Sequence, residues 1–86
     1  MEQTEVIKYP LSTEKSIRLM EAENKLIFVV DRKAKKQEIK KAIESMFKTK
    51  VVKVNTFIDH NGEKRAYIKF SKDMPAIDVA TQLGML

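Results

Sequence analysis

The 86-residue sequence contains no cysteine, no tryptophan, one histidine and two glycines. The lack of cysteine excludes a disulfide framework and thiolate metal sites. The single histidine, His60, falls in a predicted turn, and no second histidine or cysteine exists to complete a metal or nucleophile site. Asp59 and Glu63 flank His60, but three donors on one turn make at best a weak cation site. Since neither glycine lies in a phosphate-binding loop, the sequence predicts no enzyme, no metal and no cofactor.

Long hydrophobic runs are also missing. The longest apolar run, residues 26–30, is far shorter than the roughly 20 residues that cross a bilayer. Residues 1–10 include acids and no apolar segment, so we expect no signal peptide. Without an internal repeat, low-complexity tract or linker, a chain of this length is expected to form one domain, residues 1–86. We expect a soluble intracellular protein with no membrane span.

Positive charge exceeds negative charge, and the excess is concentrated in one part of the chain. The formal net charge is +5, from 17 Lys and Arg against 12 Asp and Glu. Residues 32–53 hold nine cations and two acids, a net charge of +7, while the remaining eight cations and ten acids give −2. A concentrated basic patch favours a polyanion as partner. A lysine-rich solvated helix would give the same count, so the charge alone leaves both interpretations open.

Two strand-like stretches, residues 51–58 and 66–70, form the centre of the predicted fold. Both are rich in β-branched and aromatic residues. The pair Asn61-Gly62 between them is typical of a type I′ turn, in which both central residues need a positive φ. We therefore expect a β-hairpin closed by this tight turn.

Alternation along the hairpin separates two faces. The face expected in the core carries Val52, Val54, Thr56 and Ile58, then Ala66, Ile68 and Phe70. The opposite face carries Val51, Lys53, Asn55 and Phe57, then Arg65, Tyr67, Lys69 and Ser71. Cations, an amide and flat rings on one sheet face suit RNA, because phosphates bind Lys and Arg while exposed bases stack. A solvated sheet surface, or a floor beneath another helix, is the alternative.

The flanking segments complete an α+β pattern. Pro10 makes residues 6–11 an edge strand or a packed lead-in. The strand 25–31 is expected at the centre of the sheet, because its apolar run requires cover on both faces. Helices are expected over residues 13–23, 37–48 and 75–83, with Asn24 as the left-handed stop of the first. The predicted order is β-α-β-α-β-β-α, in one small domain with a mostly antiparallel sheet and helices packed on it.

The helix of residues 37–48 has a clear apolar stripe but a weak start. Ala34, Lys35 and Lys36 supply no Ser, Thr, Asp or Asn as N-cap. Exposed lysines near a helix N-terminus oppose its dipole by about 0.3–1 kcal/mol each. Cations placed where they disfavour the helix indicate an anion outside the protein.

Three stretches together resemble a known family. Residues 10–16 (PLSTEKS) are similar to its opening signature, residues 52–56 (VKVNT) to its core strand motif, and residues 64–71 (KRAYIKFS) to its second hairpin strand. Val79 supplies the apolar residue of the last helix. On these motifs the sequence resembles the universal large-subunit ribosomal protein twenty-three family. It departs from the family pattern at Phe70, where leucine is commoner, and at Lys35, where the family has Thr or Asn.

The resemblance implies a structural, non-enzymatic ribosomal protein with a ferredoxin-like-related fold, located in the cytoplasm beside the exit of the polypeptide tunnel. Its implied partners are large-subunit ribosomal RNA, a small helical ribosomal protein, and nascent-chain factors such as the signal recognition particle. Glu14 matches the family's docking position for such factors; the residue itself is equally explained as a first-turn acid that favours the helix dipole. The short hairpin loop resembles the archaeal branch, since the bacterial branch has a long loop that reaches into the tunnel.

We expect the RNA-binding residues to converge on one positive surface. Phosphate contacts are expected from Lys33, Lys35, Lys36, Lys40, Lys53, Lys64 and Arg65. Hydrogen bonds to sugars, phosphates or base edges are expected from Lys15, Asn55 and Thr56. Tyr67 and Phe57 either stack on bases or pack against the core or a helix. The alternative is a small α/β module for protein interaction or ligand sensing, whose lysines only keep it soluble.

Overall fold

The structure, a computed structural model, describes residues 3–84 and confirms the predicted α+β order. Its elements are α1 (Gln3–Val6), β1 (Ile7–Pro10), α2 (Glu14–Glu23), β2 (Lys25–Val30), α3 (Lys36–Phe47), β3 (Val51–Ile58), β4 (Lys64–Phe70) and α4 (Ala76–Gln82). The short helix α1 was not predicted. Within the described range, no helix combines the length and the apolar character needed to cross a membrane.

Four strands form one antiparallel sheet in the order β1-β2-β4-β3. β2 lies between β1 and β4, and all five of its residues after Lys25 are buried, which confirms the predicted central strand. β1 and β3 are the two edges of the sheet. Pro10 ends the edge strand β1, where a missing N–H disturbs the ladder least.

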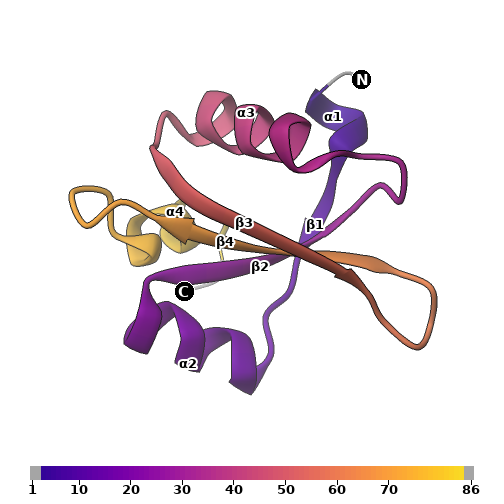
Figure 1. Cartoon of the computed structure of the whole chain (residues 1–86). Coiled ribbons are helices and arrows are strands. Elements are labelled where there is room, and N and C mark those ends of the chain that lie inside the picture. The colour runs from indigo at the N-terminus through magenta and orange to yellow at the C-terminus, as the bar shows by residue number, and fades with distance from the viewer. Residues whose placement is uncertain (1–2, 85–86) are drawn as a thin grey trace.

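The helices cover the two faces of the sheet unequally (Figure 1). α1 and α3 lie on one side of the sheet, and α2 lies on the other. α3 buries Ile39 and Ile43 in the core. Its Phe47 ring packs against Phe28 of β2, with the two centroids 6.3 Å apart. α4 contacts β2 and α2 and adds Val79 to the same core.

Asn24 joins three elements at one corner of the molecule. Its φ of 57° ends α2 in the left-handed conformation, as predicted. Its amide nitrogen donates to the carbonyls of Phe70 at 3.0 Å and Ser71 at 3.1 Å. Its Oδ1 accepts a hydrogen bond from Ala76 N at 2.6 Å and so caps the start of α4. One side chain therefore ties the end of α2 to the end of β4 and the start of α4.

Two helix starts are capped in different ways. At α2, Ser16 N donates to Thr13 Oγ1 at 3.1 Å and Thr13 N donates to Ser16 Oγ at 2.8 Å, a reciprocal capping box. At α3, Lys35 offers no capping side chain, as expected, but its N–H donates to Glu38 Oε1 at 3.0 Å. This backbone hydrogen bond lowers the pKa of the Glu38 carboxyl. The start of α3 therefore gains a hydrogen bond to the Glu38 side chain, although the side chain of its N-cap residue supplies none.

A bulge in β3 reverses the predicted face assignments of two residues, Val51 and Val52. The register passes from Val51 opposite Phe70 to Lys53 opposite Lys69, so Val52 is an extra residue in β3. Val51 is consequently buried in the core, whereas Val52 is 60 % exposed. The prediction that placed Val52 in the core and Val51 on the opposite face is wrong, because strict alternation does not count the extra residue. Ile58, also predicted in the core, is exposed at the end of the strand.

The hairpin turn differs from the predicted type I′ turn. Gly62 N donates to Asp59 O at 3.0 Å, and Asp59 N donates to Glu63 O at 2.9 Å. Gly62 has a φ of 82°, but the φ of Asn61 is not positive. This pattern is typical of a type I turn followed by a left-handed glycine. Asp59 Oδ1 stabilises it by accepting hydrogen bonds from the N–H groups of Asn61 and Glu63.

Candidate nucleic-acid interface

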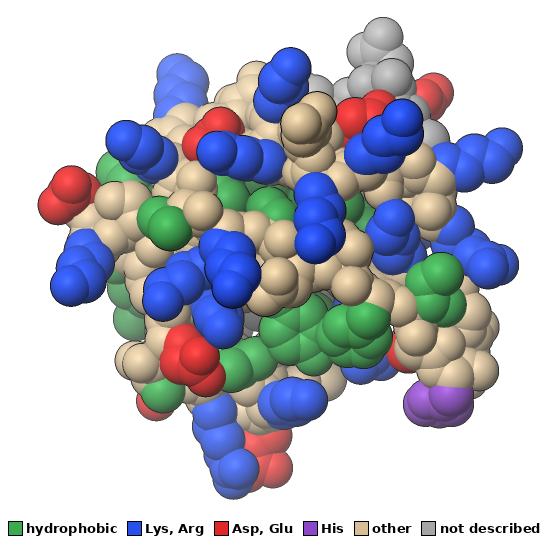
Figure 2. Space-filling model, viewed as in Figure 1, with side chains coloured by type: hydrophobic (Ala, Val, Ile, Leu, Met, Phe, Trp, Pro, Cys, Tyr) green, Lys and Arg blue, Asp and Glu red, His purple; other side chains and the backbone are tan. Residues whose placement is uncertain are grey.

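One part of the sheet is left uncovered by helices. α2 packs mainly on β2, so the hairpin strands β3 and β4 are exposed on the α2 side of the sheet. Figure 2 shows hydrophobic side chains at the surface beneath the hairpin strands, with basic side chains beside them. We call this region the open sheet face, and its residues are Lys53, Asn55, Phe57, Arg65, Tyr67 and Lys69.

The open sheet face is ordered in cross-strand rows. Phe57 is 44 % exposed, and its ring meets Tyr67 at a centroid distance of 5.1 Å with a tilt of 38°. The centroid distance lies within the range of interacting aromatic pairs. The three rows place Lys53 opposite Lys69, Asn55 opposite Tyr67, and Phe57 opposite Arg65.

Arg65 forms an ion pair at the base of the hairpin. Its Nε lies 3.1 Å from Asp59 Oδ2, in a contact that lacks hydrogen-bond alignment. Burial works to raise the pKa of the Asp59 carboxyl, but hydrogen bonds from the N–H groups of Glu63 and Asn61, with the Arg65 charge, lower it overall. The Arg65 side chain is therefore already engaged inside the protein.

The other turn residues also serve internal contacts. Tyr9 OH of β1 donates to Glu63 Oε2 at 2.7 Å, and this hydrogen bond raises the pKa of Tyr9. His60 is exposed at the turn. Across residues 3–84, no group of three or more His, Cys, Asp or Glu side chains could hold a metal ion. The carboxylates around His60 therefore fix the conformation of the hairpin.

Lys64 and Thr56, both predicted to bind RNA, lie on the opposite side of the hairpin. Thr56 is opposite the buried Ala66, in the alternation that faces the core. Lys64 Nζ donates to Ala34 O at 2.7 Å, in the segment that leads into α3. This hydrogen bond ties β4 to the start of α3, so the structure assigns Lys64 an internal contact.

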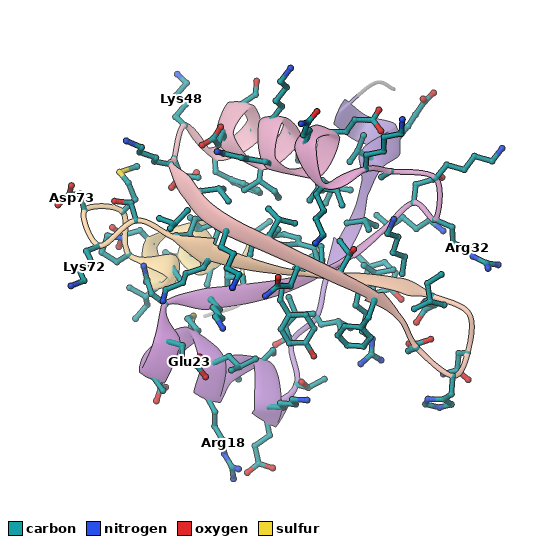
Figure 3. The ribbon with its side chains drawn as sticks, in the orientation of Figure 1. Arg18, Glu23, Arg32, Lys48, Lys72 and Asp73 are labelled. Atoms are coloured by element: carbon teal, nitrogen blue, oxygen red, sulfur yellow. The ribbon has the colours of Figure 1, made fainter. Side chains whose placement is uncertain are left out.

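The remaining predicted phosphate-binding lysines are exposed around the start of α3. α3 lies on the far side of the sheet from α2 (Figure 1), and Figure 3 shows Arg32, just before these lysines, pointing away from the molecule. The expected convergence of all cations on one surface is therefore wrong, because the sheet separates two basic regions. We call the second region the α3 basic surface, and its residues are Lys33, Lys35, Lys36 and Lys40.

Glu14 and Lys15 lie in the first turn of α2, and both are exposed. Glu14 Oε1 accepts a hydrogen bond from the guanidinium of Arg18 at 3.2 Å. Exposed pairs of this kind contribute little to stability. Figure 3 shows Arg18 pointing into solvent from α2. Glu14 and Lys15 are therefore accessible to a partner.

The sequence is similar to one known family over most of its length. A family model described as Ribosomal protein L23 matches residues 5–77. The chain belongs to this family. A curated relative, large ribosomal subunit protein uL23 of Trypanosoma brucei brucei, is 46 % identical over 81 residues, which make up 94 % of this chain and 49 % of the relative. The chain thus spans about half the length of that relative, which is eukaryotic and gives no support to an archaeal assignment.

Lys69 of this ribosomal-protein domain is missing from the predicted set of RNA-binding residues. Alternation places it on the same face as Arg65 and Tyr67. Only the register of the sheet shows that it lies directly opposite Lys53. That register depends on the bulge at Val52, for which the sequence carries no local signal.

Proposed function

We propose that the protein is a structural, non-enzymatic constituent of the large ribosomal subunit, which binds ribosomal RNA on ribosomes of the cytoplasm. The observation that carries this proposal is the family match over residues 5–77. Exposed cations on both sides of the sheet support it, because a protein that is surrounded by folded RNA meets phosphates in more than one direction.

The two basic regions suit different contacts. The α3 basic surface offers lysine ammonium groups alone, which pair with phosphates regardless of base sequence. The open sheet face adds two rings and an amide, which can interact with unstacked bases. Phosphate pairing on α3 positions the protein, and the open sheet face adds contacts that depend on RNA shape.

We further infer that the domain lies at the exit of the polypeptide tunnel, where it contacts a small helical ribosomal protein. Glu14 would contribute to the docking of nascent-chain factors such as the signal recognition particle, and its exposure supports this role. The short loop closed by Asp59 and Glu63 supports an archaeal-type hairpin. A Glu14→Gln variant is expected to weaken factor binding to purified ribosomes while changing RNA binding little. Equal factor binding by the variant contradicts the docking role.

Titration of the protein with large-subunit ribosomal RNA over a salt series tests the RNA-binding proposal. If about six phosphates are neutralised, log Kobs falls against log salt with a slope of about −4 to −5. A flat salt response, or no binding at low salt, contradicts the proposal.

Charge reversal on the α3 basic surface separates this proposal from a protein-interaction or ligand-sensing module. Replacing Lys35, Lys36 and Lys40 by Glu is expected to weaken RNA binding, because favourable phosphate contacts become repulsive. In the alternative, these lysines only keep the protein soluble, and recovery of a partner protein is unchanged by the substitutions. Co-sedimentation with large ribosomal subunits measures the first outcome, and affinity recovery of a partner protein measures the second.

A further inference from the structure

The side chain of Phe57 packs against one neighbouring ring and remains partly exposed to solvent. Its ring packs against Tyr67 at a centroid distance of 5.1 Å, and the residue as a whole is 44 % exposed. Tyr67 is itself half-buried between its neighbours Ile27 on β2 and Asn55 on β3. Tyr67 therefore restrains the Phe57 ring and leaves ring surface free for a planar partner.

Lys53 and Lys69 place two positive charges directly opposite each other beside these rings. Both are exposed, and no acid among residues 3–84 pairs with either ammonium group. Like charges directly opposite each other destabilise an antiparallel strand pair. Arg65 on the same face is already paired with Asp59. The lysine pair is therefore the part of the open sheet face that an external anion would neutralise.

We propose that the open sheet face binds an unpaired RNA nucleotide, with its base stacked on Phe57 and a phosphate of the same strand between Lys53 and Lys69. Asn55 lies between the lysine row and Phe57 on the same face, so its amide can hydrogen-bond a base edge or a ribose 2′-hydroxyl. A duplex keeps its bases stacked on one another, so the site selects a bulge, a loop or a strand end. This inference rests on the proposed function and specifies the kind of RNA that this face recognises.

A short oligoribonucleotide of about eight nucleotides, with 2-aminopurine at one unpaired position, is the probe. Binding to the full chain is expected to quench the probe, and pairing the probe with its complement is expected to abolish the quenching. Phe57→Leu keeps an apolar side chain but removes the ring, so we expect about 5- to 150-fold weaker binding and loss of quenching. Phe57→Tyr retains a ring and is expected to retain both.

Two lysine pairs provide matched variants with equal changes of charge. The double variant Lys53→Gln/Lys69→Gln is expected to weaken probe binding. It should also reduce the slope of log Kobs against log salt by about 0.7 per lost phosphate contact. Lys36→Gln with Lys40→Gln on the α3 basic surface is expected to weaken binding to complete ribosomal RNA and to leave probe quenching unchanged. Thermal unfolding of each variant checks that it folds.

Unchanged affinity and quenching in Phe57→Leu overturn the proposal, even if the wild-type protein binds ribosomal RNA and so continues to support the proposed function. Should Phe57→Leu fail to fold, the Lys53 and Lys69 variant decides in its place, and probe binding equal to wild type overturns the proposal. If the wild-type protein does not bind ribosomal RNA at low salt, the proposed function itself is contradicted.

Discussion

On one side of the sheet Phe28 is completely buried and packs against Phe47 of α3, while on the other side Phe57 is partly exposed to solvent. The covered side is filled by residues that pack with one another. The open side instead keeps a lysine pair and a ring pair at the surface, an arrangement that buries less apolar surface than the core. The difference indicates that stability and the proposed RNA binding depend on separate sets of side chains, which substitutions can distinguish.

The largest contrast is expected between Phe28→Ala and Phe57→Ala. Phe28→Ala leaves a cavity in the core and should lower the free energy of unfolding by about 3–5 kcal/mol. Phe57→Ala loses the contact with Tyr67 and the partial burial of the ring, and should cost about 1–3 kcal/mol. Urea unfolding followed by circular dichroism measures both. Equal losses in the two variants would contradict the division of the sheet into a structural and a binding side.

Asn24→Ala tests the corner that holds the covering helices in place. The substitution removes three hydrogen bonds and puts an alanine in the left-handed conformation, so we expect a loss of about 2–4 kcal/mol in the free energy of unfolding. Asn24→Gly is the control, because glycine tolerates the backbone conformation while also losing the hydrogen bonds. Urea unfolding should rank wild type above Asn24→Gly and Asn24→Gly above Asn24→Ala. An Asn24→Ala urea midpoint equal to that of wild type would show that the hydrogen bonds of Asn24 do not contribute to stability.

Asp59→Asn is expected to have a smaller effect, which depends on pH. Because the pKa of Asp59 is lowered in the folded protein, its charged form stabilises the fold. This contribution is complete above the unfolded pKa of about 3.9 and is lost as the pH falls through the lower folded-state pKa. The difference in urea midpoint between wild type and Asp59→Asn should therefore be constant from about pH 5 to 7 and shrink below about pH 4. Asp73→Asn, in an exposed loop (Figure 3), is the control and should leave the midpoint nearly unchanged.

The smallest expected change in stability comes from Lys69→Glu on the open sheet face. The substitution replaces a like-charge pair with an opposite-charge pair across the strands, so the free energy of unfolding should rise by about 0.2–1 kcal/mol. Affinity for the 2-aminopurine probe should fall in the same protein. Lys72→Glu, in the exposed loop after β4 (Figure 3), makes the same change of charge without a lysine opposite. If Lys72→Glu matches Lys69→Glu in both measurements, the effect belongs to net charge and not to the lysine pair.

Features with a regular period could be predicted from the sequence. The unbroken apolar run of β2 correctly predicts a central strand, because both faces of such a strand need cover. The spacing of Ile39, Ala42 and Ile43 correctly predicts the buried side of α3. Asn24 is likewise recognised as a helix stop from its residue type and position.

Features that depend on long-range register or on single side chains could not be predicted. The bulge at Val52 leaves the composition of β3 unchanged and appears only when Lys53 is aligned with Lys69. Asp59 selects the turn type through hydrogen bonds to the backbone, which outweigh the preference of Asn61-Gly62 for a type I′ turn. The count of charges along residues 32–53 ignores the sheet, which separates the lysines of α3 from Lys53.

The outer edge of β3 also affects how the protein behaves in the absence of RNA. Its outer edge pairs with no other strand of residues 3–84, and an open edge of this kind can recruit a strand from another molecule. The bulge at Val52 twists this edge, and the exposed Lys53 beside it adds charge, which are two features that discourage intermolecular sheet growth. We therefore expect the irregularity that brings Lys53 opposite Lys69 also to disfavour strand pairing between copies of the protein.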